Sequence, residues 1–148
     1  MEILIKPITP DDYPYVIESH EKWRSIKPDY KELTLEEISK VHQNPDFRGF
    51  IAWIGDRRVG RIAGLADAKN FNVGSLWVDE DYRRRGVATL LLKKLFRYHQ
   101  PGTPTRIAIH KRNPLYAQLR KFYGKFGFTR VIKESENLLM LGSPPLTQ

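Results

Sequence analysis

The amino-acid sequence predicts an α/β protein in which about seven strands form a mixed sheet flanked by four helices. Apolar runs of strand length alternate with segments whose apolar residues recur at helical spacing. Their order is β, α, α, β, β, β, α, β, α, β, β, which is typical of a sheet with helices on its faces. With 148 residues, of which 41% are hydrophobic, the chain is long enough for a single domain over residues 1–148.

Capping residues predict where the first two helices begin. A strand at residues 3–8 leads to Thr9, which suits the N-cap position, and Pro10 suits the first helical position. The second helix follows a capping box formed by Thr34 and Glu37, because each side chain can satisfy the other residue's main-chain N–H group.

A hairpin, a strand and a third helix are predicted for the middle of the chain. Strands at residues 50–54 and 59–65 flank a turn at residues 55–58. A strand at residues 73–78 comes next. A helix is expected from about residue 84 to 98, with one apolar row formed by Val87, Leu91, Leu95 and Tyr98.

The C-terminal part predicts one strand, one helix and a closing pair of strands. The strand covers residues 106–110, and the helix opens at Asn113-Pro114 and ends at Gly127. Strands at residues 128–132 and 137–141 then form the closing pair. The tail at residues 142–148 is expected to be frayed.

Composition excludes several classes of protein. The chain has no cysteine, so disulfides, thiolate metal sites and a cysteine nucleophile are excluded. No apolar run approaches the roughly 18 residues of a membrane span, and the N-terminus does not resemble a signal peptide. The four histidines show no metal-ligand spacing, so no metal is expected. We expect a soluble, cytoplasmic protein that does not bind membranes.

Charge is distributed unevenly along the chain. Residues 1–82 carry 11 basic and 15 acidic side chains, whereas residues 83–148 carry 14 basic and 2 acidic side chains. A strongly basic half calls for an anionic partner. Nucleic acid is one candidate, a phosphate-rich cofactor is another, and a merely solvated basic face is a third interpretation.

The loop between the strand at residues 73–78 and the following helix is the most informative segment. Arg83, Arg84 and Arg85 precede Gly86 at the expected start of the helix. The first turn of a helix has unpaired N–H groups and the positive end of the dipole. A glycine lets a ligand approach the main chain closely. This combination indicates a pyrophosphate site, placed after the acidic residues 79–81.

Two motifs resemble the GNAT family of N-acetyltransferases. Arg83-Arg84-Arg85-Gly86-Val87-Ala88 is similar to its R/Q-x-x-G-x-G/A signature, and Leu76-Trp77-Val78-Asp79 is similar to the strand that precedes it. Phe122-Tyr123-Gly124-Lys125-Phe126-Gly127-Phe128 resembles the Y-x-x-x-G-F ending of the fourth helix. The element order agrees from residue 3 to residue 141. The resemblance implies the GNAT acyl-CoA N-acyltransferase fold, with a mostly antiparallel sheet.

The resemblance also implies an activity and a set of site residues. The activity is transfer of acetyl from acetyl-CoA to a primary amine by direct attack. The main-chain N–H near Val78 would stabilise the oxyanion and Tyr123 would protonate the leaving thiolate. The implied cofactor-binding residues are Leu76, Trp77, Val78, Arg83, Arg84, Arg85, Gly86, Val87, Ala88, Thr89, Asn113, Tyr116 and Tyr123.

Asn113 departs from the family pattern. Many members have an asparagine seven residues before the tyrosine, whereas Asn113 lies ten residues before Tyr123. Either the helix starts one turn earlier or the contact between the asparagine and the cofactor is lost. The residue also suits a helix cap, so a purely structural role for Asn113 stays open. Tyr123 has a structural alternative too, as part of a packed aromatic stripe with Tyr116.

A base must remove a proton from the acceptor, because a free alkylamine has a pKa of about 10.4. His110, at the end of its strand, is the best candidate, while Asp67 and Glu21 are weaker ones. A chain of ordered waters, or a structural role for His110, stays open. The resemblance places the acceptor near the first two helices, where Glu18, Glu21 and Trp23 suit a cationic amine.

Several alternatives remain at this stage. The acceptor could be a polyamine-like molecule, an amino acid, a lysine side chain or a protein N-terminus. The chain could instead be a basic nucleic-acid-binding module, although its basic residues cluster around one glycine-marked loop, which favours a compact polyphosphate. It could also be a GNAT-fold protein that binds acyl-CoA without catalysis. The resemblance leaves a homodimer open.

Overall fold

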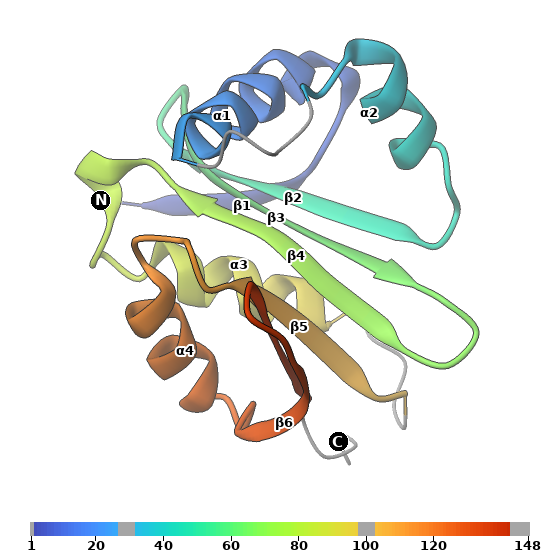
Figure 1. Cartoon of the computed structure of the whole chain (residues 1–148). Coiled ribbons are helices and arrows are strands. Elements are labelled where there is room, and N and C mark those ends of the chain that lie inside the picture. Colours follow the sequence, from blue (N-terminus) through green and yellow to red (C-terminus); the bar gives the residue numbers. More distant parts are fainter. Residues whose placement is uncertain (1, 27–31, 98–102, 143–148) are drawn as a thin grey trace. The chain divides into compact units, whose positions relative to one another are not determined.

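A computed structural model of the chain describes residues 2–26, 32–97 and 103–142 (Figure 1). Hydrogen bonds link its strands in the order β1-β2-β3-β4-β5-β7-β6. The predicted order of strands and helices is confirmed. The elements are β1 (Ile3–Pro7), the 3-10 helix η1 (Pro10–Asp12), α1 (Tyr13–Ile26), α2 (Leu35–His42), β2 (Phe47–Ile54), β3 (Arg57–Ala66), β4 (Phe71–Val78), the 3-10 helix η2 (Glu80–Tyr82), α3 (Val87–Phe96), β5 (Thr105–His110), α4 (Tyr116–Gly124), β6 (Arg130–Glu134) and β7 (Leu138–Gly142).

The chain forms two compact units, and strand β4 contributes to both. The first unit comprises Met1–Leu65 and Ser75–His99, and the second comprises Ala66–Gly74 and Gln100–Gln148. Residues 1, 27–31, 98–102 and 143–148 lie outside the described part of the chain, and so does the predicted frayed tail after Gly142.

In the first unit, β1 pairs with β2 and β2 pairs with β3, both antiparallel. Helices α1 and α2 lie over one face of these strands and α3 lies against the other (Figure 1). Val16, Ile38 and Ile51 form the cluster on the α1 and α2 side. On α3 the predicted apolar row is confirmed for Val87, Leu91 and Leu95, all at most 1% exposed, while Tyr98 is not described. The burial of Ile38 explains why the eight-residue helix α2 is stable, since packing supplies most helical stability.

The second unit is built on β5, β7 and β6, with antiparallel pairs β5–β7 and β7–β6. The first residues of β4, Phe71–Val73, pair in parallel with Thr105–Ile107 of β5. Its core consists mainly of large apolar side chains from β5, β7, α4 and the loop after α4, namely Ile107, Ile109, Tyr123, Phe128, Leu139 and Leu141. Strand β6 is at the edge of the sheet, and all five of its residues are exposed.

Several predicted boundaries were wrong, for local reasons. The third helix begins at Val87, not at residue 84, because Arg84 and Gly86 have φ values of 63° and 85°, which a right-handed helix cannot contain. The last helix begins at Tyr116, because the Asn113 side chain accepts a hydrogen bond from the Leu115 N–H (2.9 Å) in a separate turn before it. The first helix is preceded by a short 3-10 helix, η1, which continues directly into it.

The strand pairs also differ from the prediction. The hairpin turn is only Gly55-Asp56, because β3 already begins at Arg57 and Gly55 takes a positive φ of 61°. The closing strands lie one or two residues later than predicted, with their turn at Ser135–Asn137. The N-cap at Thr34 is confirmed, with Thr34 Oγ1 accepting from the Glu37 N–H at 3.2 Å. The Glu37 carboxylate accepts from the Thr34 hydroxyl at 3.1 Å, where the predicted capping box has it accept from the Thr34 main-chain N–H.

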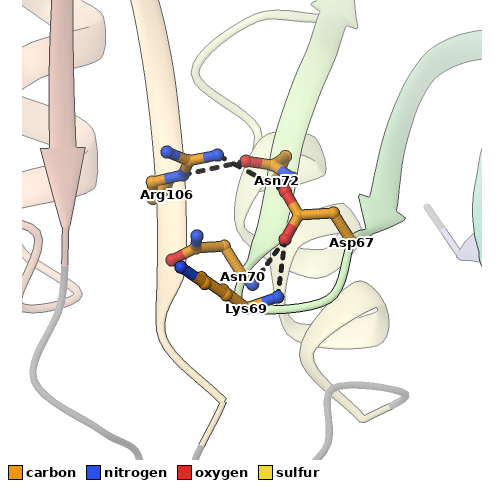
Figure 2. Close-up of polar contacts among 5 residues, drawn as sticks. All are labelled: Asp67, Lys69, Asn70, Asn72 and Arg106. Carbon is orange, nitrogen blue, oxygen red and sulfur yellow. Dashed lines mark hydrogen bonds and ion pairs between the residues drawn. The ribbon is translucent and has the colours of Figure 1, made fainter.

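Asp67 organises the turn between β3 and β4 and ties it to β5 in the second unit (Figure 2). One carboxylate oxygen accepts from the main-chain N–H groups of Lys69 and Asn70, at 2.8 and 2.7 Å. The other accepts from Asn72 Nδ2 at 2.9 Å and lies 3.4 Å from Arg106 Nη2. Arg106 Nε also donates to Asn72 Oδ1 at 3.0 Å. The turn therefore depends on an ionised carboxylate.

Stability should depend on the charge of Asp67. The hydrogen bond from Asn72, followed by those from Lys69 and Asn70, lowers its pKa from 3.8 to about 2. Because the pKa of Asp67 is lower in the folded protein than in the unfolded one, its ionised carboxylate stabilises the fold at pH values above 3.8. This stabilisation is lost as the pH falls from 3.8 toward about 2. We expect urea unfolding of Asp67→Asn to show a weaker loss of stability over that range than the natural chain. Equal pH dependence in both proteins would contradict the role of this carboxylate.

Candidate functional site

Hydrogen bonds fix the carboxyl end of strand β4 in the first unit. The Asp79 N–H donates to the Val59 carbonyl at 2.8 Å, which ties the residue after β4 to β3. Asp79 Oδ1 accepts from Tyr15 Oη on α1 at 3.0 Å and from Trp77 Nε1 at 2.9 Å. Burial, followed by the negative charge of Asp79, raises the pKa of Tyr15 well above its usual value. Tyr15 therefore keeps its proton and remains a donor to this carboxylate.

The three arginines after η2 have different environments. Arg83 Nε donates to the Val78 carbonyl at 2.9 Å, and its guanidinium lies 5.1 Å from the centre of the Trp77 ring. Arg85 lies 5.3 Å from the centre of the Tyr82 ring. Arg84 and Arg85 are both exposed, whereas Arg83 is partly buried. Arg83 thus helps to hold the end of β4, and the exposed pair carries the charge available to an anion.

Gly86 opens helix α3 in a left-handed conformation, with φ 85° and ψ 5°. The Leu90 N–H donates to the Gly86 carbonyl at 3.1 Å, so the amides of Val87, Ala88 and Thr89 precede the first helical hydrogen bond. A side chain at Gly86 would meet no atom within 4 Å, and the residue is exposed. Among the described residues, this turn is accessible to an approaching anion.

Close packing beneath this turn fixes the start of α3. The Val87 side chain is 1% exposed and belongs to the core, so only its main chain can contact a ligand. Gly60 of β3 lies beneath it, and a Cβ there would lie 3.0 Å from the Trp77 carbonyl oxygen and 3.1 Å from Val87 Cγ1. Ala88 and Thr89 are partly exposed.

In the second unit, Tyr123 is 3% exposed and packs edge-on against Phe122 and Phe128, with ring centres 5.4 and 6.3 Å away. Burial raises the pKa of Tyr123 well above its usual value. The packed ring is compatible with the structural alternative for Tyr123, in which it belongs to the core of the second unit.

The other predicted cofactor and base residues in the second unit have partners of their own. Asn113 is 9% exposed and uses its side-chain oxygen in the turn before α4. Tyr116 is partly exposed, with Arg120 Nη1 at 3.5 Å from its hydroxyl. His110 ends β5, opposite Leu138 of β7, and is partly exposed. Both carboxylate oxygens of Asp67 accept hydrogen bonds from the turn before β4 and from Asn72.

The residues predicted for the acceptor lie on helix α1. Glu18 is exposed and faces Lys22 at 3.6 Å, one helical turn later. Glu21 is exposed, and the Trp23 side chain lies outside the described part of the chain. The described residues contain no group of three or more His, Asp or Glu side chains that could hold a metal ion. None of the described helices is long and apolar enough to cross a membrane.

Sequence analysis missed several residues that shape this region. Tyr15 and Asp79 form their hydrogen bond across 64 positions of sequence, so no local pattern reveals it. Arg57, from the β2–β3 hairpin, also lies 5.3 Å from the centre of the Tyr82 ring. In the sequence, the sign of a buried polar contact in this region was Arg61, because it is a charged residue within the apolar run at residues 59–65 that was predicted as a strand.

Comparison with known proteins identifies the family. The family model described as acetyltransferase (GNAT) domain matches residues 45–130, which is more than half of the chain. The chain therefore belongs to the GNAT acetyltransferase family. This confirms the predicted family, the fold class and an acetyl-CoA-dependent acyltransferase. A comparison with curated protein sequences finds no significant match.

Solved structures share the fold at low sequence identity. The PaiA N-acetyltransferase of Thermoplasma acidophilum, in complex with coenzyme A, is 20% identical, with a TM-score of 0.75 and coverage of 97% of this chain and 99% of that chain. An acetyltransferase of Thermus thermophilus is 22% identical, with a TM-score of 0.74 and coverage of 99% and 98%. Arabidopsis thaliana NAA60, in complex with a bisubstrate analogue, is 17% identical, with a TM-score of 0.74 and coverage of 95% and 98%.

Replacing Gly60 tests the packing under the start of α3. The added methyl of Gly60→Ala must displace the Trp77 carbonyl, Val87 or Leu91, which lies 3.2 Å from its position. We expect the free energy of unfolding to fall by about 1–3 kcal/mol in chemical denaturation. Gly124→Ala is the control, because a methyl there meets no atom within 4 Å and alanine suits a helix better. Equal effects of the two substitutions would contradict close packing at Gly60.

Proposed function

We propose that this GNAT acetyltransferase holds the diphosphate of acetyl-CoA at the start of α3 and transfers the acetyl group directly to a primary amine. The observation that carries the proposal is the exposed left-handed turn at Gly86, beside two exposed arginines and the first-turn amides of α3. Such a turn offers hydrogen-bond donors, the positive end of a helix dipole and formal charge at one place.

The reaction has three physical requirements that named residues could meet. The amine nitrogen attacks the thioester carbon, and a main-chain N–H near Val78 stabilises the oxyanion that forms. The carbon–sulfur bond then breaks, and the thiolate accepts the proton of the Tyr123 hydroxyl. Burial raises the pKa of Tyr123, so its hydroxyl is protonated at neutral pH but is a weaker acid than an exposed tyrosine. The role therefore requires the thiolate to form within hydrogen-bond distance of this hydroxyl. The attacking nitrogen loses its proton to a base, for which we propose His110.

The acceptor is proposed to be a small-molecule or peptide amine that approaches α1. Glu18 and Glu21 are exposed carboxylates on this helix and could attract a cation before it is deprotonated. Arabidopsis thaliana NAA60, which shares the fold, is in complex with a bisubstrate analogue, which is compatible with a donor and an acceptor held together in one site.

Binding of coenzyme A tests the phosphate site. At about 100 times its dissociation constant, the ligand should add roughly 2.7 kcal/mol to the stability of the natural chain. We expect Arg84→Gln with Arg85→Gln to weaken binding about tenfold or more in calorimetry, since two exposed cations beside the diphosphate are lost.

Lys93→Gln with Lys94→Gln is the matched control, because it removes the same amount of charge from α3, away from the turn at Gly86. Equal weakening by both pairs would mean that general electrostatics, not this loop, binds the anion. Binding of duplex DNA that weakens steeply with salt would favour the nucleic-acid alternative.

Tyr123→Phe tests the proton donor. We expect kcat to fall by about 10²-fold or more while the dissociation constant of coenzyme A stays unchanged, because only the hydroxyl is lost from a buried ring. Release of free thiol with time measures turnover. Tyr13→Phe is the control, since it removes a tyrosine hydroxyl from α1, whose ring packs against His42. Unchanged turnover in Tyr123→Phe would refute the assigned role.

A further inference from the structure

Arg61 is a buried cation without an anionic partner among the described residues. It lies in the middle of β3, and its side chain is 6% exposed. Its Nε donates to Ser19 Oγ of α1 at 2.5 Å, and its Nη1 donates to the Ser75 carbonyl of β4 at 3.2 Å. The three residues belong to the first unit, so one guanidinium connects a helix and two strands within it.

Burial of this charge is unfavourable. Burial lowers the pKa of Arg61 to about 10, because loss of water disfavours the charged guanidinium. A buried charge that lacks an opposite charge often destabilises a fold relative to an apolar residue of similar size. The positive charge of Arg61 also contributes to a lowered pKa of His42, after the larger effect of burial. The guanidinium therefore needs an explanation beyond packing.

Its partner on β4 has an unusual main-chain conformation. Ser75 has a φ of 59°, in the left-handed region that residues other than glycine rarely adopt. Such a conformation costs free energy and persists only where the surroundings hold it. Ser75 lies three residues before Val78, whose N–H we propose as the oxyanion donor.

At the α1 end of this connection, the Ser19 hydroxyl acts both as a donor and as an acceptor. Ser19 is 1% exposed, and its hydroxyl donates to the Val16 carbonyl at 2.9 Å while accepting from Arg61. The chain of hydrogen bonds runs from the main chain of α1, through Arg61, to the main chain of β4. Every acceptor along it is a neutral oxygen, so the arrangement provides orientation rather than charge neutralisation.

We propose that Arg61 is a positioning residue, which holds the left-handed main chain at Ser75 within β4 and thereby sets the main chain of residues 76–78 for the thioester. This inference rests on the proposed function. Without the guanidinium, the Ser75 carbonyl loses its side-chain donor, and the strand can relax toward an ordinary extended conformation. Since catalytic groups misplaced by about 1 Å can cost 10²-fold in rate, such relaxation would slow acetyl transfer.

A double-mutant cycle tests the proposal. Arg61→Met removes the donor and keeps much of the volume, and we expect kcat to fall at least tenfold with the dissociation constant of coenzyme A changed less than threefold. Ser75→Gly alone should be nearly neutral, because glycine adopts a positive φ without strain. In the Ser75→Gly background, the loss caused by Arg61→Met should shrink to less than threefold. Equal losses in both backgrounds would overturn the proposal.

Hydrogen exchange separates this inference from the proposed function. We expect Arg61→Met to accelerate exchange of the amides of residues 75–78 at least tenfold. Arg58→Met is the control on the same strand, because the Arg58 side chain pairs with Asp12 and packs on Trp53. If the natural chain transfers no acetyl, the proposed function fails, while selective exchange in Arg61→Met would still support the positioning role. Exchange that rises equally in both variants would refute it.

Arg61→Lys provides a second test in case Arg61→Met folds poorly. A lysine keeps the charge but has one nitrogen, which cannot bridge the Ser19 hydroxyl and the Ser75 carbonyl as a planar guanidinium does. We expect a folded protein whose kcat lies below that of the natural chain and whose residues 75–78 exchange faster. A lysine variant with natural kcat and natural exchange would show that charge alone suffices, which contradicts the proposal.

Discussion

The anchoring of the carboxyl end of β4 is the constraint on which the candidate site depends. Asp79 binds β3 through its main chain and α1 through its carboxylate, and Arg83 holds the Val78 carbonyl. The turn at Gly86 can stay exposed because the residues before it are fixed by these contacts and Val87 after it is buried. The turn proposed to bind the diphosphate thus stands on a rigid base, which would limit the entropy lost when a ligand binds.

Much of the architecture could be predicted from local patterns, because capping residues and apolar spacing act over a few positions. The N-cap at Thr34 and the buried row of α3 are of this kind. The start of α3 was placed too early because a run of arginines is compatible with a helix. The left-handed main chain at Arg84 and Gly86 prevents the helix from starting before Val87.

The site was predictable where it is contiguous in sequence, and not where it depends on tertiary contacts. Gly86 and its arginines follow one another, so their pattern indicated a phosphate site. The connection from Ser19 through Arg61 to Ser75 joins three distant segments, and nothing in the local sequence marks Ser75 as left-handed. The sequence likewise did not show that neighbouring arginines differ in role, since Arg83 holds the end of β4 while Arg84 is exposed.

The exposed edge strand β6 has a consequence for how the protein behaves in concentrated solution. Val131 and Ile132 are 44% and 41% exposed on it, and an open strand edge can recruit a strand from another molecule into amyloid-like growth. Two features oppose this. A register shift between Val131 and Lys133 disrupts the regular ladder, and Arg130 and Lys133 add like charges that repel an identical strand. The edge thus combines hydrophobic residues with built-in resistance to aggregation.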